Sequence, residues 1–180
     1  LEKRIRRKDK KLSWVIMSAS MVYDSPEHPS FILAQFQNVT DKVISERKEF
    51  EFQQKFASAF YGSSIAMIIC TLDGNISEVN EAACVFLGYT RPELLKLNNN
   101  EVQFADDRKL DWQLMEDMFS GKTRGYTVEK RYLHKKDIIV HGLLTMNLIR
   151  NAEGKPVNIV AQIQDITAKV QIERSIDQER

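Results

Sequence analysis

Apolar and polar side chains alternate over residues 12–23, so that Val15 and Met17 share one face of this segment. A period of two residues is typical of a β-strand with one buried face. Residues 24–29 follow with two prolines and an aspartate, which favour a turn. Residues 31–37 are again apolar and rich in β-forming side chains. The pattern therefore predicts a β-hairpin.

The same pattern recurs in the second half of the chain, because residues 1–47 align without a gap with residues 128–174 at an offset of 127 positions. Identical residues at matched positions include Glu2-Lys3-Arg4 with Glu129-Lys130-Arg131, Pro29 with Pro156, Ala34-Gln35 with Ala161-Gln162, and Thr40 with Thr167. Such a match indicates a repeated unit. We predict one three-stranded antiparallel meander over residues 1–40 and another over residues 128–167. The first is expected to be the end of a module that begins in a longer protein.

Residues 41–60 contain neither glycine nor proline, which favours a linker helix. Apolar residues recur at sevens along it, at Val43, Phe50 and Ala57, with Phe56 and Phe60 nearby. This edge could pack against a sheet or against a partner helix, and the pattern leaves both open.

Two threonines stand where a strand is followed by a polar, helix-favouring run. Thr40 precedes the linker helix, and Thr167 precedes a C-terminal helix expected over residues 168–180. Threonine hydroxyls commonly accept a hydrogen bond from a free amide at a helix start. We predict that both residues are N-caps.

The complete second module is expected over residues 61–167. A short apolar strand over residues 66–71 is followed by an Asp73-Gly74 turn and a partner strand. A compact helix then runs from Glu81 to Leu87, between Asn80 and Gly88. The longest helical pattern of the module is residues 106–120, whose apolar face comprises Leu110, Leu114, Met115 and Met118.

Composition limits the partners of the chain. A hydrophobic share of 43% is enough for a globular core, and the net charge of +1 provides no general attraction for nucleic acid. The basic residues 1–11 are interpreted as a solvated strand face and turn, so no nucleic-acid partner is expected. No apolar run approaches the roughly 20 residues that span a bilayer, so we expect no membrane contact within this segment.

Only two cysteines are present, Cys70 and Cys84, which are too few for a disulfide framework. We therefore expect a reducing, cytoplasmic setting, with a membrane anchor elsewhere in a longer protein left open.

The acidic pairs Asp106-Asp107 and Glu116-Asp117 lie on or beside a helix, where neighbouring side chains diverge. The glycines are scattered and form no phosphate-binding loop, so we expect neither catalysis nor a metal site.

The order of these elements and several short words resemble the PAS domain family. The matching words are Leu72-Asp73-Gly74, Glu78-Val79-Asn80-Glu81-Ala82-Ala83, Leu87-Gly88-Tyr89-Thr90, Glu93-Leu94-Leu95 and Gln164-Asp165-Ile166-Thr167. The resemblance implies an α+β fold with a five-stranded antiparallel sheet, short helices on one face and an enclosed pocket. Residues 1–40 resemble the last three strands of a preceding PAS domain. That copy departs in having Asn38 where the second has Asp165, which puts any coupling through the carboxylate in doubt there.

The pocket implied by the resemblance would be lined by the inward faces of the strands, which the alternation identifies. The candidates on strands and helices are Cys84, Met115, Met118, Leu144, Met146, Ile159, Ala161 and Ile163. A packed core without an open cavity is the alternative for all of them. The sequence leaves the identity and the existence of a ligand open.

Haem and flavin are not expected as cofactors. Flavin-binding members of the family carry a reactive cysteine within an Asn-Cys-Arg word, and Cys84 stands in a different local sequence. Haem-binding members place a histidine on the long helix, and residues 106–120 contain none. His134 and His141 lie on or beside predicted strands instead.

The resemblance implies a sensory or relay module of a multidomain signalling protein. Its output would be a histidine kinase of a two-component system or a GGDEF-type diguanylate cyclase, reached through flanking helices. Asp165, Thr167 and Thr40 are the candidates for signal transmission. A ligand-free dimerisation and protein-interaction module is the alternative. Because residues 1–40 would expose an apolar sheet face, a homodimer is expected.

Overall fold

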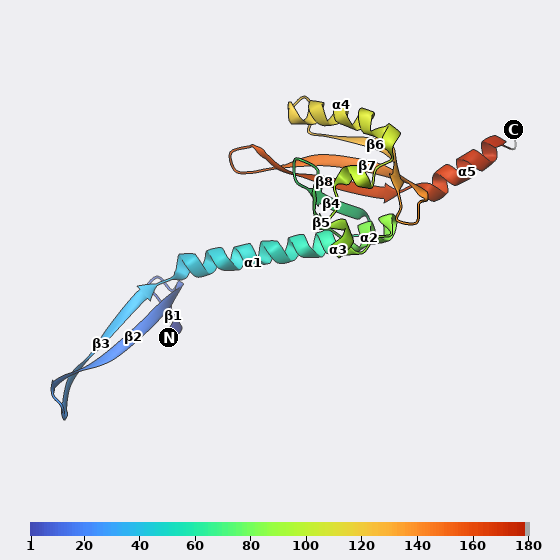
Figure 1. Cartoon of the computed structure of the whole chain (residues 1–180). Coiled ribbons are helices and arrows are strands. Elements are labelled where there is room, and N and C mark those ends of the chain that lie inside the picture. The colour runs from blue at the N-terminus through green and yellow to red at the C-terminus, as the bar shows by residue number, and fades with distance from the viewer. Residues whose placement is uncertain (179–180) are drawn as a thin grey trace. The chain divides into compact units, whose positions relative to one another are not determined.

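The computed structural model describes residues 1–178, without the side chains of residues 109–111. The chain divides into two compact units, Leu1–Phe56 and Ala57–Arg180. Figure 1 shows the elements of both units. Helix α1 (Thr40–Tyr61) continues across the boundary between them.

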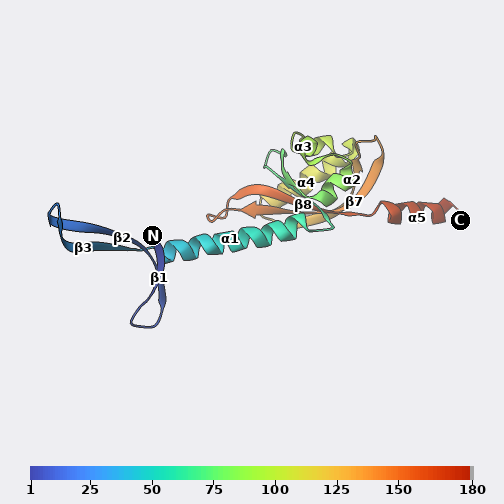
Figure 2. The ribbon, with the colours of Figure 1, turned by 90° about the horizontal axis from the view of Figure 1, so that it is seen from below.

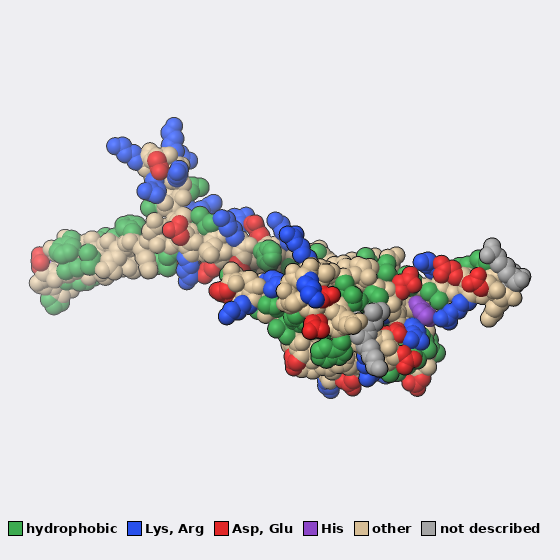
Figure 3. Space-filling view, turned by 90° about the horizontal axis from the view of Figure 1, so that it is seen from above, with side chains coloured by type: hydrophobic (Ala, Val, Ile, Leu, Met, Phe, Trp, Pro, Cys, Tyr) green, Lys and Arg blue, Asp and Glu red, His purple; other side chains and the backbone are tan. Residues whose placement is uncertain are grey.

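The first unit is a three-stranded antiparallel sheet followed by most of α1. Its strands β1 (Glu2–Arg6), β2 (Leu12–Ser25) and β3 (His28–Asn38) are adjacent in chain order. The hairpin turn is tighter than the sequence predicts, because Ser25 pairs with His28 and leaves a two-residue loop. Ser25 Oγ lies 3.1 Å from His28 Nδ1. Basic side chains gather at the turn between β1 and β2 (Figure 3).

The second unit is built on a five-stranded antiparallel sheet in the order β5-β4-β8-β7-β6. The strands are β4 (Ala66–Cys70), β5 (Ile76–Val79), β6 (Gly125–Leu133), β7 (Ile139–Arg150) and β8 (Pro156–Asp165). The helices are α2 (Glu81–Leu87), α3 (Arg91–Leu94), α4 (Arg108–Phe119) and α5 (Thr167–Gln178). Figure 2 shows α2, α3 and α4 over one face of the sheet. This is the α+β architecture that the resemblance implies.

The core of the second unit lies between this sheet and its helices. The inward faces predicted from the alternation are buried, with Leu144 and Ile163 each 2% exposed. Helix α4 contributes Met118, which is fully buried. The side chain of Leu110, predicted for the same helix face, lies outside the described residues.

Asn80 ties the start of the second unit together from a buried position. Its Oδ1 accepts hydrogen bonds from the amides of Met67 and Ala83, each at 2.9 Å. Its Nδ2 donates to the carbonyl oxygens of Phe60 and Ile65, at 3.1 and 2.8 Å. This one side chain therefore caps α2 as predicted and also holds the end of α1 against the beginning of β4.

The repeat found in the sequence is reproduced strand by strand in the backbone. Glu2 pairs with Ile16 and Met17 with Phe36 in the first unit, and Glu129 pairs with Leu143 and Leu144 with Ile163 in the second. Both residues of each pair in the first unit are offset by 127 positions from those of the matching pair in the second. The turns also agree, because Lys10 and Asp137 have positive φ values of 64° and 58°. The two meanders thus have the same register.

Within the described part of the chain, none of the helices is both long and apolar enough to cross a bilayer.

Candidate functional site

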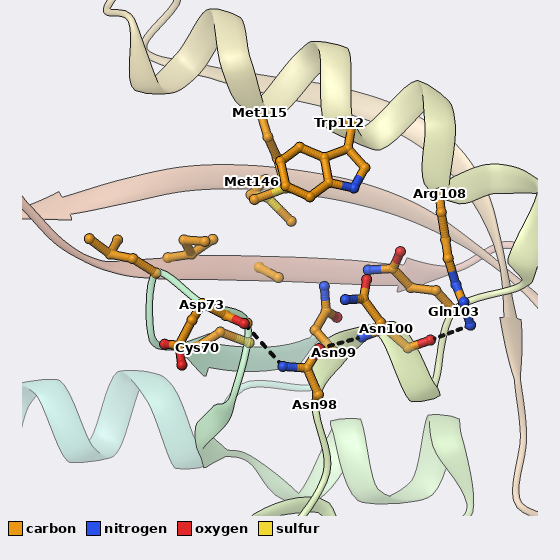
Figure 4. Close-up of a pocket in the computed structure, with 14 residues that line it drawn as sticks. Cys70, Asp73, Asn98, Asn99, Asn100, Gln103, Arg108, Trp112, Met115 and Met146 are labelled. Carbon is orange, nitrogen blue, oxygen red and sulfur yellow. Dashed lines mark hydrogen bonds between the residues drawn. The ribbon is translucent and has the colours of Figure 1, made fainter.

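A small cavity of about 120 Å³ lies between α4, the segment before it and the inner face of the sheet (Figure 4). Its lining comes from three parts of the second unit, namely the sheet, the turn after β4 and the loops and helix that follow α3. The residues that line it are Cys70, Leu72, Asp73, Gly74, Asn98, Asn99, Asn100, Gln103, Arg108, Trp112, Met115, Met146, Ile159 and Ala161.

One side of the cavity is apolar and is formed by residues that strand alternation and the helical spacing select. Met146 lies on β7, Ile159 and Ala161 lie on β8, and Met115 reaches the cavity from α4. The Cys70 thiol adjoins this wall, and burial raises its pKa to about 12. The thiol is therefore neutral near pH 7, and the wall carries no charge.

The other four predicted pocket residues lie elsewhere. Met118 and Leu144 are packed within the core, and Cys84 is buried on α2. Ile163 borders a separate open hollow together with Asp165. Alternation identifies which side chains point inward, but it does not tell which of them adjoin empty space.

The polar side of the cavity was not predicted from the sequence. The segment 98–100 is held to the turn after β4, because Asn98 Nδ2 donates to the Asp73 carbonyl oxygen at 3.0 Å. Arg108 then donates to the Asn100 carbonyl oxygen at 2.8 Å (Figure 4). The three consecutive asparagines Asn98-Asn99-Asn100 indicate only an interruption of the helical pattern when the sequence is considered alone. The available signal was that asparagine favours helix caps and turns, and Asn98 indeed caps the short 3-10 helix Asn99–Glu101.

Helix α4 is fixed to the edge strand β6 by a charged pair. The backbone amide of Arg131 donates to Asp107 Oδ2 at 2.9 Å, and its guanidinium contacts the same carboxylate. These bonds from Arg131 lower the pKa of Asp107 below its ordinary value. The guanidinium carbon also lies 4.3 Å from the centre of the Phe104 ring. The pair thereby positions the helix that carries Trp112 and Met115 over the cavity.

The exit from the sheet to α5 is a hydrogen-bonded corner. Asp165 Oδ1 accepts from the Thr167 amide at 2.8 Å, and Thr167 Oγ1 accepts from the amide of His141 on β7 at 2.9 Å. The prediction that the Thr167 hydroxyl caps the helix was therefore wrong, because the hydroxyl accepts from the amide of His141 on a strand. The aspartate satisfies the free amide at the helix start, while the threonine ties the helix to a strand.

The exit from the first sheet to α1 has the same construction. Asn38 Oδ1 accepts from the Thr40 amide at 3.0 Å, and Thr40 Oγ1 accepts from the Trp14 amide at 2.9 Å. The side-chain amide oxygen of Asn38 thus accepts the same backbone hydrogen bond that the carboxylate oxygen of Asp165 accepts in the second copy. The two copies differ at this corner in the negative charge of Asp165 and in the residue on the neighbouring strand, which is Trp14 in the first and His141 in the second. In the first copy Thr40 Oγ1 also donates to Asn38 Oδ1 at 2.6 Å.

The described residues offer no group of three histidine, cysteine, aspartate or glutamate side chains that could hold a metal ion. The cavity volume is also well below the roughly 300 Å³ at which ordinary ligand pockets begin. Haem and flavin are larger than the space that this cavity provides.

The five-stranded antiparallel sheet, with helices over one face and a small cavity between them, defines an α+β domain with an internal pocket. The family model described as PAS domain matches residues 64–168. The chain belongs to the PAS domain family, and the fold that the resemblance implies is confirmed.

Curated relatives match over similar lengths of the chain. The probable diguanylate cyclase DgcE of Escherichia coli (strain K12) is 35% identical over 123 residues, which are 68% of this chain and 11% of that protein. The biofilm dispersion protein BdlA of Pseudomonas aeruginosa is 28% identical over 120 residues, which are 63% of this chain and 27% of that protein. The chain thus spans only a small part of either relative.

Solved structures show the same fold. The crystal structure of a PAS domain from Colwellia psychrerythraea has a TM-score of 0.60 and 20% identity. The match covers 65% of this chain and 98% of that one. Such a likeness supports the fold of the second unit.

Proposed function

We propose that this chain is a sensory relay segment of a multidomain signalling protein. Occupancy of the cavity, or a protein partner, favours one arrangement of the sheet and α4 over another. The change reaches an output domain through the exit helix α5. A ligand shifts such an equilibrium only by as much as its affinity differs between the two arrangements.

The observation that carries this proposal is the corner formed by Asp165, Thr167 and His141. It joins β7, β8 and α5 through side-chain bonds of 2.8 and 2.9 Å. Met146 and Ile159, on the same two strands, line the cavity. A shift of these strands at the cavity therefore has a short, hydrogen-bonded route to the start of the helix.

The arrangement is proposed to occur twice in tandem. Residues 1–40 would be the last three strands of a preceding PAS domain, residues 41–60 the linker helix, residues 61–167 the complete domain, and the helix after Thr167 the output connection. The matched register and the second corner at Asn38, Thr40 and Trp14 support this division. Thr40 would pass a signal from the first domain to the linker as Thr167 does from the second.

The output domain is proposed to be a diguanylate cyclase of the GGDEF type or a histidine kinase. The similarity to a protein named as a probable diguanylate cyclase supports the first of these. The catalytic residues would then lie outside this chain, whose own role is to bind and relay.

The relay is tested in the protein that carries this segment with its output domain. Asp165→Ala removes the acceptor at the helix start, and we expect the output activity to lose its response to the signal while ligand affinity stays within about twofold. Asp177→Asn, an exposed aspartate on α5, is the matched control and should leave the response intact. An unchanged response in Asp165→Ala would contradict the proposed route.

A ligand-free dimerisation module is the second candidate. Of the aromatic side chains along the predicted edge of α1, Phe50 is 61% and Phe56 is 46% exposed, whereas Phe60 is buried. Exposed aromatic side chains of this kind are enriched in protein interfaces. Native mass spectrometry of the purified chain distinguishes the two functions, because a retained small molecule supports sensing and an empty homodimer supports assembly.

A further inference from the structure

We propose that the cavity takes a small neutral molecule of about one ring, whose hydrogen-bonding edge pairs with the carboxamide of Gln103. This inference rests on the proposed sensory function and specifies the chemical class of ligand. The observation behind it is a side-chain amide on a buried residue that faces the cavity and has no partner among the described residues.

Gln103 is only 4% exposed and lines the cavity. Its backbone forms a bridge to Tyr132, the Phe104 amide donates to the Arg131 carbonyl oxygen at 3.1 Å, and the Leu133 amide donates to the Val102 carbonyl oxygen at 2.9 Å. Residues 102–104 are thus paired with β6 like a short strand. Since Val102 is fully buried, alternation places Gln103 on the opposite side, where Figure 4 shows its side chain at the cavity.

The side-chain hydrogen bonds of the described residues include none from the Gln103 carboxamide, which lines the cavity although the residue as a whole is only 4% exposed. Buried amides normally have their donors and acceptors satisfied. The group offers one acceptor oxygen and two N–H donors side by side. A ligand with an adjacent acceptor and donor satisfies it, whereas an apolar ligand leaves it unpaired. Asn99, which is partly buried and also lines the cavity, adds a second carboxamide nearby.

The surroundings of this amide favour an uncharged ligand. The inner wall consists of apolar side chains, and the buried Cys70 thiol is neutral. The charged lining residues Asp73 and Arg108 are exposed and already hydrogen-bonded, to Asn75 Nδ2 and to the Asn100 carbonyl oxygen. A charge placed within the apolar wall would lose hydration without a paired counter-charge.

The volume sets the size of the ligand. An engineered apolar cavity of about 150 Å³ binds benzene. The space here is about 120 Å³, so a single six-membered ring is near the upper limit. The ring would lie against Met146 and Ile159 with its polar edge at Gln103.

The probe for this site is 2-pyridone, a six-membered ring with adjacent C=O and N–H groups, and benzene is its apolar counterpart. Titration of the whole chain is followed calorimetrically and by the side-chain NH₂ signals of Gln103 in ¹H–¹⁵N spectra. We expect 2-pyridone to bind at least tenfold more tightly than benzene and to shift the Gln103 signals. Gln103→Leu should lose that preference, and Gln162→Leu, on the exposed outer face of β8, should keep it.

Equal affinities for the two probes, or an unshifted Gln103 signal at saturating 2-pyridone, would overturn the inference. So would no binding of 2-pyridone to the wild-type chain, since an ordered water would then be the sufficient partner of the amide. The Gln103 signal is read in the wild-type chain and does not depend on the folding of a variant. These outcomes are independent of the Asp165→Ala response, so failure of this inference and failure of the relay are distinguishable.

Discussion

The two meanders of this chain have the same strands, the same register and the same helix-exit corner, but they differ in what covers them. Ile159 on β8 is 3% exposed, and its twin Ile32 on β3 is 64% exposed. Ile163 is 2% exposed, while Phe36 at the matched position is 59% exposed. The backbone therefore follows from local sequence, whereas burial follows from the helices and strands that pack on it.

The comparison also separates structural parts from functional ones. The corner bonds at Thr40 and Thr167 recur in both copies, so they belong to the meander itself. The cavity requires α4, β4 and the segment 98–103, for which residues 1–56 contain no counterpart. The proposed sensing thus requires the second unit, whereas attachment of the exit helix requires only the three strands of a meander.

The largest expected effect is the difference between two identical substitutions, Ile159→Ala and Ile32→Ala. Removing the buried side chain should lower the free energy of unfolding of the second unit by about 2–5 kcal/mol. The exposed twin should change the stability of the first unit by less than about 0.5 kcal/mol. Urea unfolding with residue-resolved hydrogen exchange measures both. Similar losses at the two positions would mean that the first sheet is covered in this chain.

Asn80 has no counterpart in the repeated segment, so its loss should affect the second unit alone. Asn80→Ala leaves buried amides and carbonyl oxygens of α1, β4 and α2 without partners. We expect a cost of about 3 kcal/mol, with faster hydrogen exchange at Met67 and Ala83. Asn75→Ala, at an exposed turn, is the matched control. A loss below about 1 kcal/mol would show that Asn80 does not hold this junction.

The two corners should respond alike to loss of the threonine hydroxyl. Thr167→Val and Thr40→Val each remove the acceptor of one strand amide, at a cost of about 1 kcal/mol. Hydrogen exchange at His141 and Trp14 should accelerate by comparable factors in the respective variants. Acceleration at only one of the two amides would break the equivalence of the corners.

The smallest expected effect is on the pH dependence of stability, and it distinguishes Arg131 from Arg4, the arginine at the matched position of the first copy. Arg131 lowers the pKa of Asp107, whereas its twin Arg4 lies with its guanidinium carbon 5.5 Å from the centre of the Trp14 ring. A lowered pKa stabilises the fold at pH values above the unfolded pKa of about 3.9, and this contribution is lost as pH falls through the folded pKa. Because the pair is partly exposed, it should contribute less than about 1 kcal/mol.

Acid unfolding of the Asp107→Asn variant measures that contribution. The second unit of the variant should lose less stability than the wild-type unit below about pH 4. Glu93, whose pKa is lowered to about 2 by its hydrogen bond from Lys135, acts in the same direction and remains in both proteins. Identical acid profiles of the two proteins would show that the Asp107–Arg131 pair contributes nothing measurable.

The sequence allowed the strands, the repeat and the helix ends at Asn80 and Gly88 to be predicted, because alternation, turn residues and caps act over a few positions. The position of Gln103 at the cavity could not be predicted, since it depends on pairing with β6, about 30 positions away. The partner of Thr167 was missed for the same reason, because His141 lies on another strand. Local sequence patterns identify helices and strands and the side chains that point inward. Contacts between residues far apart in the sequence determine where cavities and unpaired polar groups remain.

The most direct test of the repeated meander is its register in solution, measured by cross-strand nuclear Overhauser effects. We predict backbone contacts between Met17 and Phe36 in the same pattern as those between Leu144 and Ile163. The amides of Trp14 and His141 should both be protected from exchange. Helical or disordered signals over residues 2–38, or a register displaced by one residue, would contradict the claim that one meander is used twice.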